Sequence, residues 1–142
     1  MSKHYAHARW MGNLPEGKGK YILKTSGYEG DLTFSSRFED SKDASSPEEL
    51  IGAAHASCFS MAFANALSQA GYKPEKIETD AVVTLAKAAD GFTITEILLN
   101  TTGKVSGINK QKFEEIASDA KENCPVSKAL KAVNIKLEAM LL

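Results

Sequence analysis

The chain contains two cysteines, Cys58 and Cys124, and these are its strongest candidates for chemistry. In a reducing compartment, so small a number of thiols indicates catalysis, redox sensing or burial rather than a structural disulfide. Cys58 falls in the middle of an expected helix, four residues from Ala54 on one side and from Ala62 on the other. Because these neighbours are small, the thiol could face a cavity. The alternative is an inert core residue, since free cysteine is among the most buried residue types.

Cys124 has a different context, because Pro125 follows it and marks the start of a new helix. Free N–H groups and the helix dipole at such a start favour a thiolate. The alternative is that Cys124 only caps the break that Pro125 makes. One cysteine in mid-helix and one at a helix start suit a peroxidatic and resolving pair, although the spacing alone does not fix their distance.

His55 lies three residues before Cys58 and therefore on nearly the same helix face. It could pair with the thiolate, act as a base or bind a metal ion. No Cys-x-x-Cys motif is present and a closed zinc site lacks its fourth ligand, so we expect no metal. A core or interface histidine is the default interpretation.

Arg37 is unusual by composition, because Arg9 and Arg37 are the only arginines among the 17 basic residues. A guanidinium near the start of the central helix would lower the pKa of a nearby thiol and hold a carboxylate through two parallel hydrogen bonds. The alternative is an exposed arginine at the end of a strand. Glu48 and Glu49 are explained equally well as first-turn acids that the helix dipole favours.

The element that must position these residues is a long central helix starting at Pro47. Ser46 is its expected N-cap, Glu49 completes a Ser-x-x-Glu capping box, and Gly71 is its expected left-handed C-terminal cap. Small and apolar residues occupy nearly every face, which is typical of a helix buried on all sides. Because one chain of 142 residues offers little cover for such a helix, we expect dimerisation across it.

The remaining elements alternate between strands and helices in an order typical of an α+β fold. We find no internal repeat or linker and expect one domain over residues 1–142. Beside the central helix, the pattern predicts strands over 4–11, 19–25, 31–38, 77–87, 92–101 and from 133 onward, a hairpin turn over 88–91, and helices over 109–122 and 126–131.

Composition excludes several classes of protein. The net charge is −1 with no basic run, which gives no electrostatic footprint for nucleic acid or an anionic membrane. The first residues lack the apolar core of a signal peptide. The central helix is long enough to span a bilayer, but it carries Glu48, Glu49, His55 and Asn65, so we reject a membrane span. We expect a cytoplasmic protein.

Three motifs stand out in the chain: Arg37-Phe38, the run Ser-Pro-Glu-Glu-Leu-Ile-Gly-Ala-Ala-His-Ala-Ser-Cys-Phe-Ser-Met over 46–61, and Cys-Pro-Val-Ser over 124–127. Together they resemble the OsmC branch of the OsmC/Ohr family of thiol-dependent hydroperoxide reductases, and the likeness covers essentially the whole chain. Ser46 stands where many members have Asn, another good N-cap. The Ohr branch takes its arginine from an earlier loop, whereas the position of Arg37 is similar to that in the OsmC branch.

The resemblance implies an intertwined homodimer in which antiparallel sheets wrap the central helices, with active sites at the subunit interface and no metal or cofactor. It implies that Cys58 is the peroxidatic thiolate, that Cys124 resolves it to a disulfide, and that Arg37 and Glu48 form an ion pair over Cys58. The implied substrates are organic hydroperoxides and, more weakly, hydrogen peroxide, with recycling by a dithiol of lipoyl type. We expect an apolar substrate pocket from Ile51, His55, Phe59 and Met61.

Two other classes of function stay open at this point. In a cysteine hydrolase or acyltransferase, His55 would activate Cys58, although no orienting Asp or Asn is identifiable. In a non-enzymatic binder of small apolar ligands, the same pocket would be used with both thiols idle.

Overall fold

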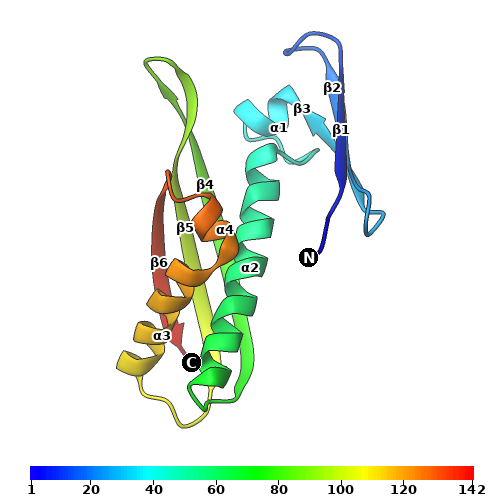
Figure 1. The fold of residues 1–142 in the computed structure, drawn as a ribbon. Coiled ribbons are helices and arrows are strands. Elements are labelled where there is room, and N and C mark those ends of the chain that lie inside the picture. Colours follow the sequence, from blue (N-terminus) through cyan, green and yellow to red (C-terminus); the bar gives the residue numbers. More distant parts are fainter. The chain divides into compact units, whose positions relative to one another are not determined.

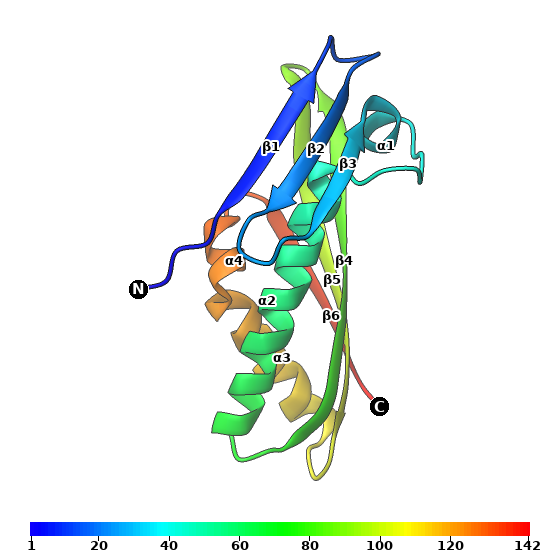
Figure 2. The ribbon, with the colours of Figure 1, turned by 90° about the vertical axis from the view of Figure 1, so that its right-hand side faces the viewer.

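The computed structural model describes all 142 residues, and the chain divides into two compact units, residues 1–50 and 51–142. The first unit is built on a three-stranded antiparallel sheet in the order β1-β2-β3 (Figures 1 and 2). Its strands are β1 (Ala6–Met11), β2 (Lys18–Leu23) and β3 (Glu29–Thr33). Gly12 and Gly27 have φ values of 91° and 83° in the two connections, a conformation that glycine adopts without strain.

The third predicted strand, over 31–38, is wrong in its second half, because β3 ends at Thr33 and the short helix α1 (Phe34–Phe38) follows. The reason is a local capping box. The Thr33 hydroxyl accepts from the backbone N–H of Ser36, and the Ser36 hydroxyl accepts from the backbone N–H of Thr33. The rings of Phe34 and Phe38, four residues apart, then pack together with centroids 4.9 Å apart. Arg37 therefore lies in the last turn of a helix rather than at the end of a strand.

The long helix α2 (Pro47–Gln69) begins and ends where the sequence predicts. The Ser46 hydroxyl accepts from the backbone N–H of Glu49, and Gly71 adopts a φ of 87° just beyond the helix. The prediction that this helix is buried on all sides is not met within one chain. Met61 is 74% exposed, and Ala54, Ser57 and Asn65 are exposed as well.

The second unit joins the rest of α2 to a three-stranded sheet in the order β4-β5-β6. The strands β4 (Pro74–Ala88) and β5 (Gly91–Val105) form the expected antiparallel hairpin. The strand β6 (Asn134–Leu141) pairs with β5 in parallel, which corrects the expectation of purely antiparallel sheets. The helices α3 (Lys110–Asn123) and α4 (Pro125–Ala129) make the crossover that a parallel pair requires.

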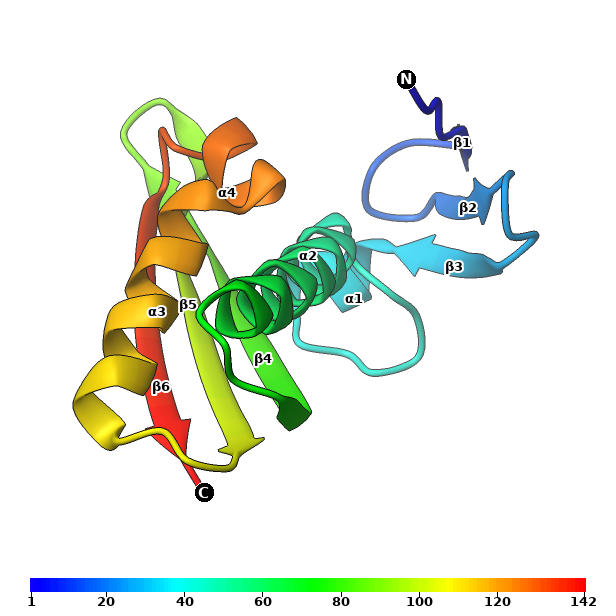
Figure 3. The same ribbon diagram turned by 60° about the horizontal axis from the view of Figure 1, so that its bottom comes forward.

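The core of the second unit lies between the sheet and the two long helices, which cover the same sheet face (Figure 3). Phe63 packs between Phe59 of the same helix and Phe113 of α3, with ring centroids 5.7 Å and 4.9 Å away. By length and composition α2 could also cross a membrane. However, its aromatic side chains are at the centre of this core, as in the central helix of a water-soluble protein. The fully buried apolar side chains are Phe59, Phe63, Leu67, Ile97, Leu99, Phe113, Ala117 and Cys124.

Candidate active site

The structure brings the two cysteines together in the second unit. The Sγ atoms of Cys58 and Cys124 lie 3.1 Å apart and share an S–H···S hydrogen bond, and both thiols are free. Cys124 joins α3 to α4 with extended backbone angles (φ −59°, ψ 124°), as the following proline requires. Cys124 has no exposed surface, whereas Cys58 is only partly buried. The pair can therefore form a disulfide after a small movement, and Cys58 is the less buried residue of the two.

The surroundings of Cys58 oppose its ionisation. Burial raises the pKa of the Cys58 thiol, and its hydrogen bond and charge interaction with Cys124 raise that pKa further. A hydrogen bond from the backbone N–H of Val126 acts in the opposite direction without outweighing them.

The surroundings of Cys124 favour its thiolate. Burial acts to raise the pKa of this thiol, but hydrogen bonds from the Ser127 backbone, the Cys58 thiol and the Ser127 hydroxyl outweigh it. The pKa of Cys124 is therefore lowered, and Val126 adds a further backbone hydrogen bond.

In the first unit, Arg37 and Glu48 form the ion pair that the resemblance implies. The Arg37 Nη2 donates to Glu48 Oε1 at 2.9 Å, and Nε donates to the two carboxylate oxygens at 3.2 and 3.3 Å. The guanidinium also lies 5.2 Å from the centre of the Phe38 ring. Glu48 is only 6% exposed, so its charge depends on this arginine, whose own side chain is 37% exposed.

A largely apolar cavity of about 310 Å³ opens beside Arg37 within the first unit. Sequence reasoning missed most of its lining, although Trp10 is the only tryptophan of the chain and could have drawn attention to it. Its size and lining are typical of a site for a small apolar molecule that carries one polar group. The lining residues are Trp10, Gly12, Leu14, Leu32, Thr33, Phe34, Arg37, Phe38 and Pro47.

The residues expected to form the substrate pocket have different surroundings within this chain. His55 and Phe59 have no exposed surface, Met61 is 74% exposed, and Ile51 is partly buried against the core. His55 makes its hydrogen bond to Ser127, with Nε2 2.8 Å from Oγ, and not to Cys58. His55 and Cys58 therefore do not form the hydrogen-bonded histidine–cysteine pair that a hydrolase or acyltransferase would need.

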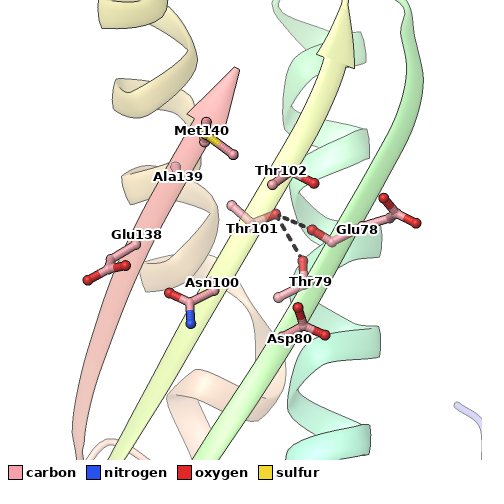
Figure 4. A pocket seen from close by; sticks show the side chains of 9 residues that line it. All are labelled: Glu78, Thr79, Asp80, Asn100, Thr101, Thr102, Glu138, Ala139 and Met140. Carbon is pink, nitrogen blue, oxygen red and sulfur yellow. Dashed lines mark hydrogen bonds between the residues drawn. The ribbon is translucent and has the colours of Figure 1, made fainter. Parts of the chain in front are cut away.

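A larger hollow, of about 670 Å³, lies on the β4-β5-β6 sheet and contains neither cysteine (Figure 4). Its lining is mostly polar and acidic, and Thr101 donates there to the backbone carbonyl of Glu78. With no thiol and no cationic side chain in its lining, this hollow offers nothing for the chemistry of the two cysteines.

Comparison with known proteins matches residues 39–138 to the family of OsmC-like proteins. The chain is 46% identical over 127 residues to peroxiredoxin OsmC of Escherichia coli strain K12, covering 88% of this chain and 87% of that one. Organic hydroperoxide resistance protein OhrB of Bacillus subtilis strain 168 is 27% identical, covering 86% of this chain and 90% of its own.

Solved structures share the fold. An OsmC-like protein of Vibrio cholerae has a TM-score of 0.76 at 22% identity, covering 98% of this chain and 99% of that one. The crystal structure of Bacillus subtilis OhrB has a TM-score of 0.72 at 23% identity, covering 95% and 97%. These likenesses confirm the predicted OsmC-like α+β fold.

Proposed function

The chain belongs to the family of OsmC-like proteins, and from that premise we propose that it is a thiol-dependent peroxidase that reduces organic hydroperoxides to alcohols. The observation that carries the proposal is the 3.1 Å separation of the Cys58 and Cys124 sulfurs. Two free thiols at this distance, one of them accessible, have the arrangement of a peroxidatic and resolving pair.

The reaction proceeds in three steps. The Cys58 thiolate attacks the distal oxygen of the hydroperoxide, the O–O bond breaks, and the alkoxide leaves and takes up a proton to become an alcohol. Cys58 is then a sulfenic acid. The Cys124 thiolate attacks the Cys58 sulfur, an S–S bond forms, and hydroxide leaves and is protonated to water. Finally, a dithiol reopens the disulfide by two exchange steps and is itself oxidised to a disulfide.

Arg37, held in place by Glu48, supplies a positive charge that stabilises the Cys58 thiolate, and both residues come from a second copy of the chain. Glu48 and Cys58 are ten residues apart in α2, and ten residues of helix rise about 15 Å. The pair of the same chain therefore does not reach its own Cys58 through this helix. Two copies of α2 packed in opposite directions would bring each Arg37 to the other chain's Cys58. The exposed helix face around Ala54, Ser57 and Met61 is available for that packing.

The substrate binds, in this proposal, in the cavity beside Arg37. The apolar lining takes an alkyl or aryl group, while the guanidinium holds the peroxide oxygens and stabilises the negative charge on the leaving oxygen. Glu48 keeps the guanidinium in one orientation through its three hydrogen bonds. Because hydrogen peroxide has no apolar group to bury, it is the poorer substrate.

The dithiol reductant attacks the Cys58 sulfur of the disulfide, because Cys124 is completely buried. A small dithiol of lipoyl type fits this approach, and the apolar cavity suits its hydrocarbon chain. We place the enzyme in the cytoplasm as a homodimer, in which a single OsmC-like domain over residues 1–142 is completed by its partner.

The proposal is tested by measuring the turnover of cumene hydroperoxide with dihydrolipoamide as reductant. Wild-type protein is expected to turn over and Cys58→Ser is expected to be inactive. Turnover of Cys58→Ser at the wild-type rate would contradict the assignment. Ser60→Ala is a matched control, because it removes a hydroxyl from the same helix whose hydrogen bond goes to Thr79.

Co-expression of two inactive variants tests whether Arg37 acts between copies. A chain with Arg37→Met and a chain with Cys58→Ser, purified together through two different tags, form one complete site only if Arg37 acts on the other chain's Cys58. Recovery of about half the wild-type turnover per dimer is expected, because one of two sites is intact. A mixed dimer as inactive as its parents would place Arg37 and Cys58 of one chain in the same site.

A further inference from the structure

The indole of Trp10 lies against two glycines, Gly17 just before β2 and Gly19 within it. Trp10 of β1 stands opposite Gly19 in the register of the first sheet. A Cβ atom at Gly19 would lie 2.6 Å from Cε3 of the indole, and a Cβ atom at Gly17 would lie 2.6 Å from its Nε1. Because Cε3 and Nε1 belong to different rings of the indole, both rings pack closely against this segment. Any larger residue at Gly19 would displace the indole.

A hydrogen bond also fixes the orientation of Trp10. The indole Nε1–H donates to the backbone carbonyl of Asn13 at 3.2 Å, in the loop that follows β1. Although both rings are held, the residue is 38% exposed. Trp10 therefore presents a rigid aromatic surface that a ligand can contact without first having to order the side chain.

The cavity beside Arg37 has aromatic side chains from two elements in its lining. Trp10 comes from β1, and Phe34 and Phe38 come from α1, where their ring centroids lie 4.9 Å apart. Arg37 lies in the same helix and is the one charged residue of the lining. The volume of about 310 Å³ is at the small end of the range for ligand pockets, so the cavity has room for one substituted ring. This lining suits an aryl group that carries one polar group.

We propose that Trp10 is a specificity-determining residue, which makes the enzyme prefer aryl hydroperoxides to saturated hydroperoxides of the same size. The aryl ring of the substrate packs on the indole, edge to face or offset, while the peroxide group binds Arg37. Such a contact between two rings favours the aromatic partner by about fivefold over a saturated ring that buries the same area. This role rests on the proposed peroxidase function, whereas the packing of Trp10 is a property of the chain itself.

Three hydroperoxides with the same tertiary reacting carbon test this preference. Cumene hydroperoxide carries a phenyl ring, its cyclohexyl analogue carries a saturated ring of similar size, and tert-butyl hydroperoxide carries a methyl group. The ratio of kcat/KM for the phenyl over the cyclohexyl compound is divided by the ratio of their rates with free dithiothreitol, which removes the difference in intrinsic reactivity. A corrected ratio of about five is expected for the wild type, with tert-butyl hydroperoxide the poorest substrate. A corrected ratio near unity would overturn the proposal.

Replacing Trp10 separates the aromatic contact from the chemistry of the thiols. Trp10→Leu keeps an apolar side chain but no ring, so the corrected ratio is expected to fall to near unity. Trp10→Phe keeps an aromatic ring and is expected to retain most of the preference. Because each ratio is measured within one variant, losses of folded protein or of Cys58 reactivity cancel. A wild-type ratio in Trp10→Leu would overturn the proposal.

Substitution of Gly19 tests whether the position of the indole matters. Gly19→Ala leaves Trp10 in the chain but places a methyl group 2.6 Å from Cε3, so the indole must move and the corrected ratio is expected to fall. Gly30→Ala is the matched control, because its methyl group would lie 2.6 Å from the Tyr21 ring in the same sheet and neither residue lines the cavity. Circular dichroism identifies the folded variants to be compared. An unchanged ratio in folded Gly19→Ala, or an equal fall in both variants, would overturn the proposal.

Binding of the alcohol product gives a readout that does not depend on turnover. Trp10 is the only tryptophan of the chain, so tryptophan fluorescence reports on this ring alone. Cumyl alcohol, which cumene hydroperoxide would yield, is expected to change the emission with a Kd about fivefold lower than that of its cyclohexyl analogue. If the protein were not a peroxidase, no hydroperoxide would be reduced, but the two alcohols would still bind in this order. Equal Kd values for the two alcohols would overturn the role of Trp10 and leave the peroxidase function standing.

Discussion

The sulfur of Cys58, in the middle of α2, lies 3.1 Å from the sulfur of Cys124, at the junction of α3 and α4. The two residues are far apart in sequence, and no other pair of thiols exists in the chain. Replacing Cys124 with serine is therefore expected to stop the reaction after its first step. One equivalent of cumene hydroperoxide should convert Cys58 to a sulfenic acid that dimedone traps, and intact mass should show the adduct.

The wild type provides the comparison for Cys124→Ser. It is expected to give little dimedone adduct, because Cys124 consumes the sulfenic acid first. An equally abundant adduct in wild type and variant would mean that Cys124 does not resolve Cys58.

Arg37→Met is expected to lower kcat/KM for cumene hydroperoxide by about 100-fold, since the proposed mechanism makes Arg37 the main donor to the reacting oxygens. It also leaves Glu48, only 6% exposed, without its partner. The free energy of unfolding should therefore fall by about 3 kcal/mol. This is near the smallest cost of removing one partner from a buried ion pair, because Arg37 itself is partly exposed.

Two controls separate catalysis from stability at this ion pair. Adding Glu48→Gln to Arg37→Met removes the unpaired buried charge, so stability should recover while activity stays low. Arg9→Met changes the other arginine, on the exposed strand β1, and should leave the stability within about 0.5 kcal/mol of wild type. Activity that recovers together with stability would contradict the role of Arg37 in the reaction.

Acid is expected to destabilise the fold partly through His55. Burial lowers the pKa of this histidine in the folded state below its ordinary 6.5, so the unfolded chain binds the proton more readily. The contribution of neutral His55 to the free energy of unfolding is therefore fully present above about pH 6.5 and is lost as the pH falls below that value. The free energy of unfolding changes by at most about 1.4 kcal/mol per pH unit through this group. Urea unfolding at a series of pH values measures this slope.

His55→Gln does not titrate and should show a shallower loss of stability in acid than the wild type. The matched control His7→Gln changes a histidine on the exposed strand β1. A wild-type slope that His55→Gln leaves unchanged would assign the acid sensitivity to other groups.

Gly103→Ala is expected to destabilise the second unit. A Cβ atom at this position of β5 would lie 2.7 Å from the Phe113 ring and 2.9 Å from the Ile77 side chain, closer than packed atoms tolerate. The cost is about 1–3 kcal/mol in the free energy of unfolding, as for other overpacked cores. The control is Lys104→Ala, at the next position, which is exposed. If both changes had the same small effect on the free energy of unfolding, the core would have adjusted around the new methyl group and the prediction would be wrong.

Sequence patterns predicted the elements whose signals are local. The Ser46 cap, the left-handed Gly71 and the amphipathic helix with Phe113 inward all lie within one element, and each is found as expected. The error at Phe34–Phe38 arose because two phenylalanines four residues apart fit both a strand and a helix turn, and the capping by Thr33 and Ser36 decided for the helix.

The site was less predictable because it depends on long-range contacts. The types and contexts of Cys58 and Cys124 suggested a pair, but only the crossover through α3 and α4 brings the two sulfurs to 3.1 Å. The contact between His55 and Ser127 has no periodic signal, since one lies on α2 and the other on α4. The cavity beside Arg37 is lined by residues of β1, the loop after β1, β3, α1 and the first residue of α2, and sequence spacing alone does not reveal it.

The pairing of Cys58 and Cys124 in a peroxidase reaction is tested most directly by a single-equivalent oxidation of the reduced wild-type protein. After removal of reductant, one molar equivalent of cumene hydroperoxide per chain is added, and free thiols and intact mass are followed over seconds, with hydrogen peroxide in parallel. Both thiols are expected to disappear, the mass to fall by two hydrogens through a Cys58–Cys124 disulfide, and the organic peroxide to react faster than hydrogen peroxide. Two thiols that survive unchanged would contradict this pairing.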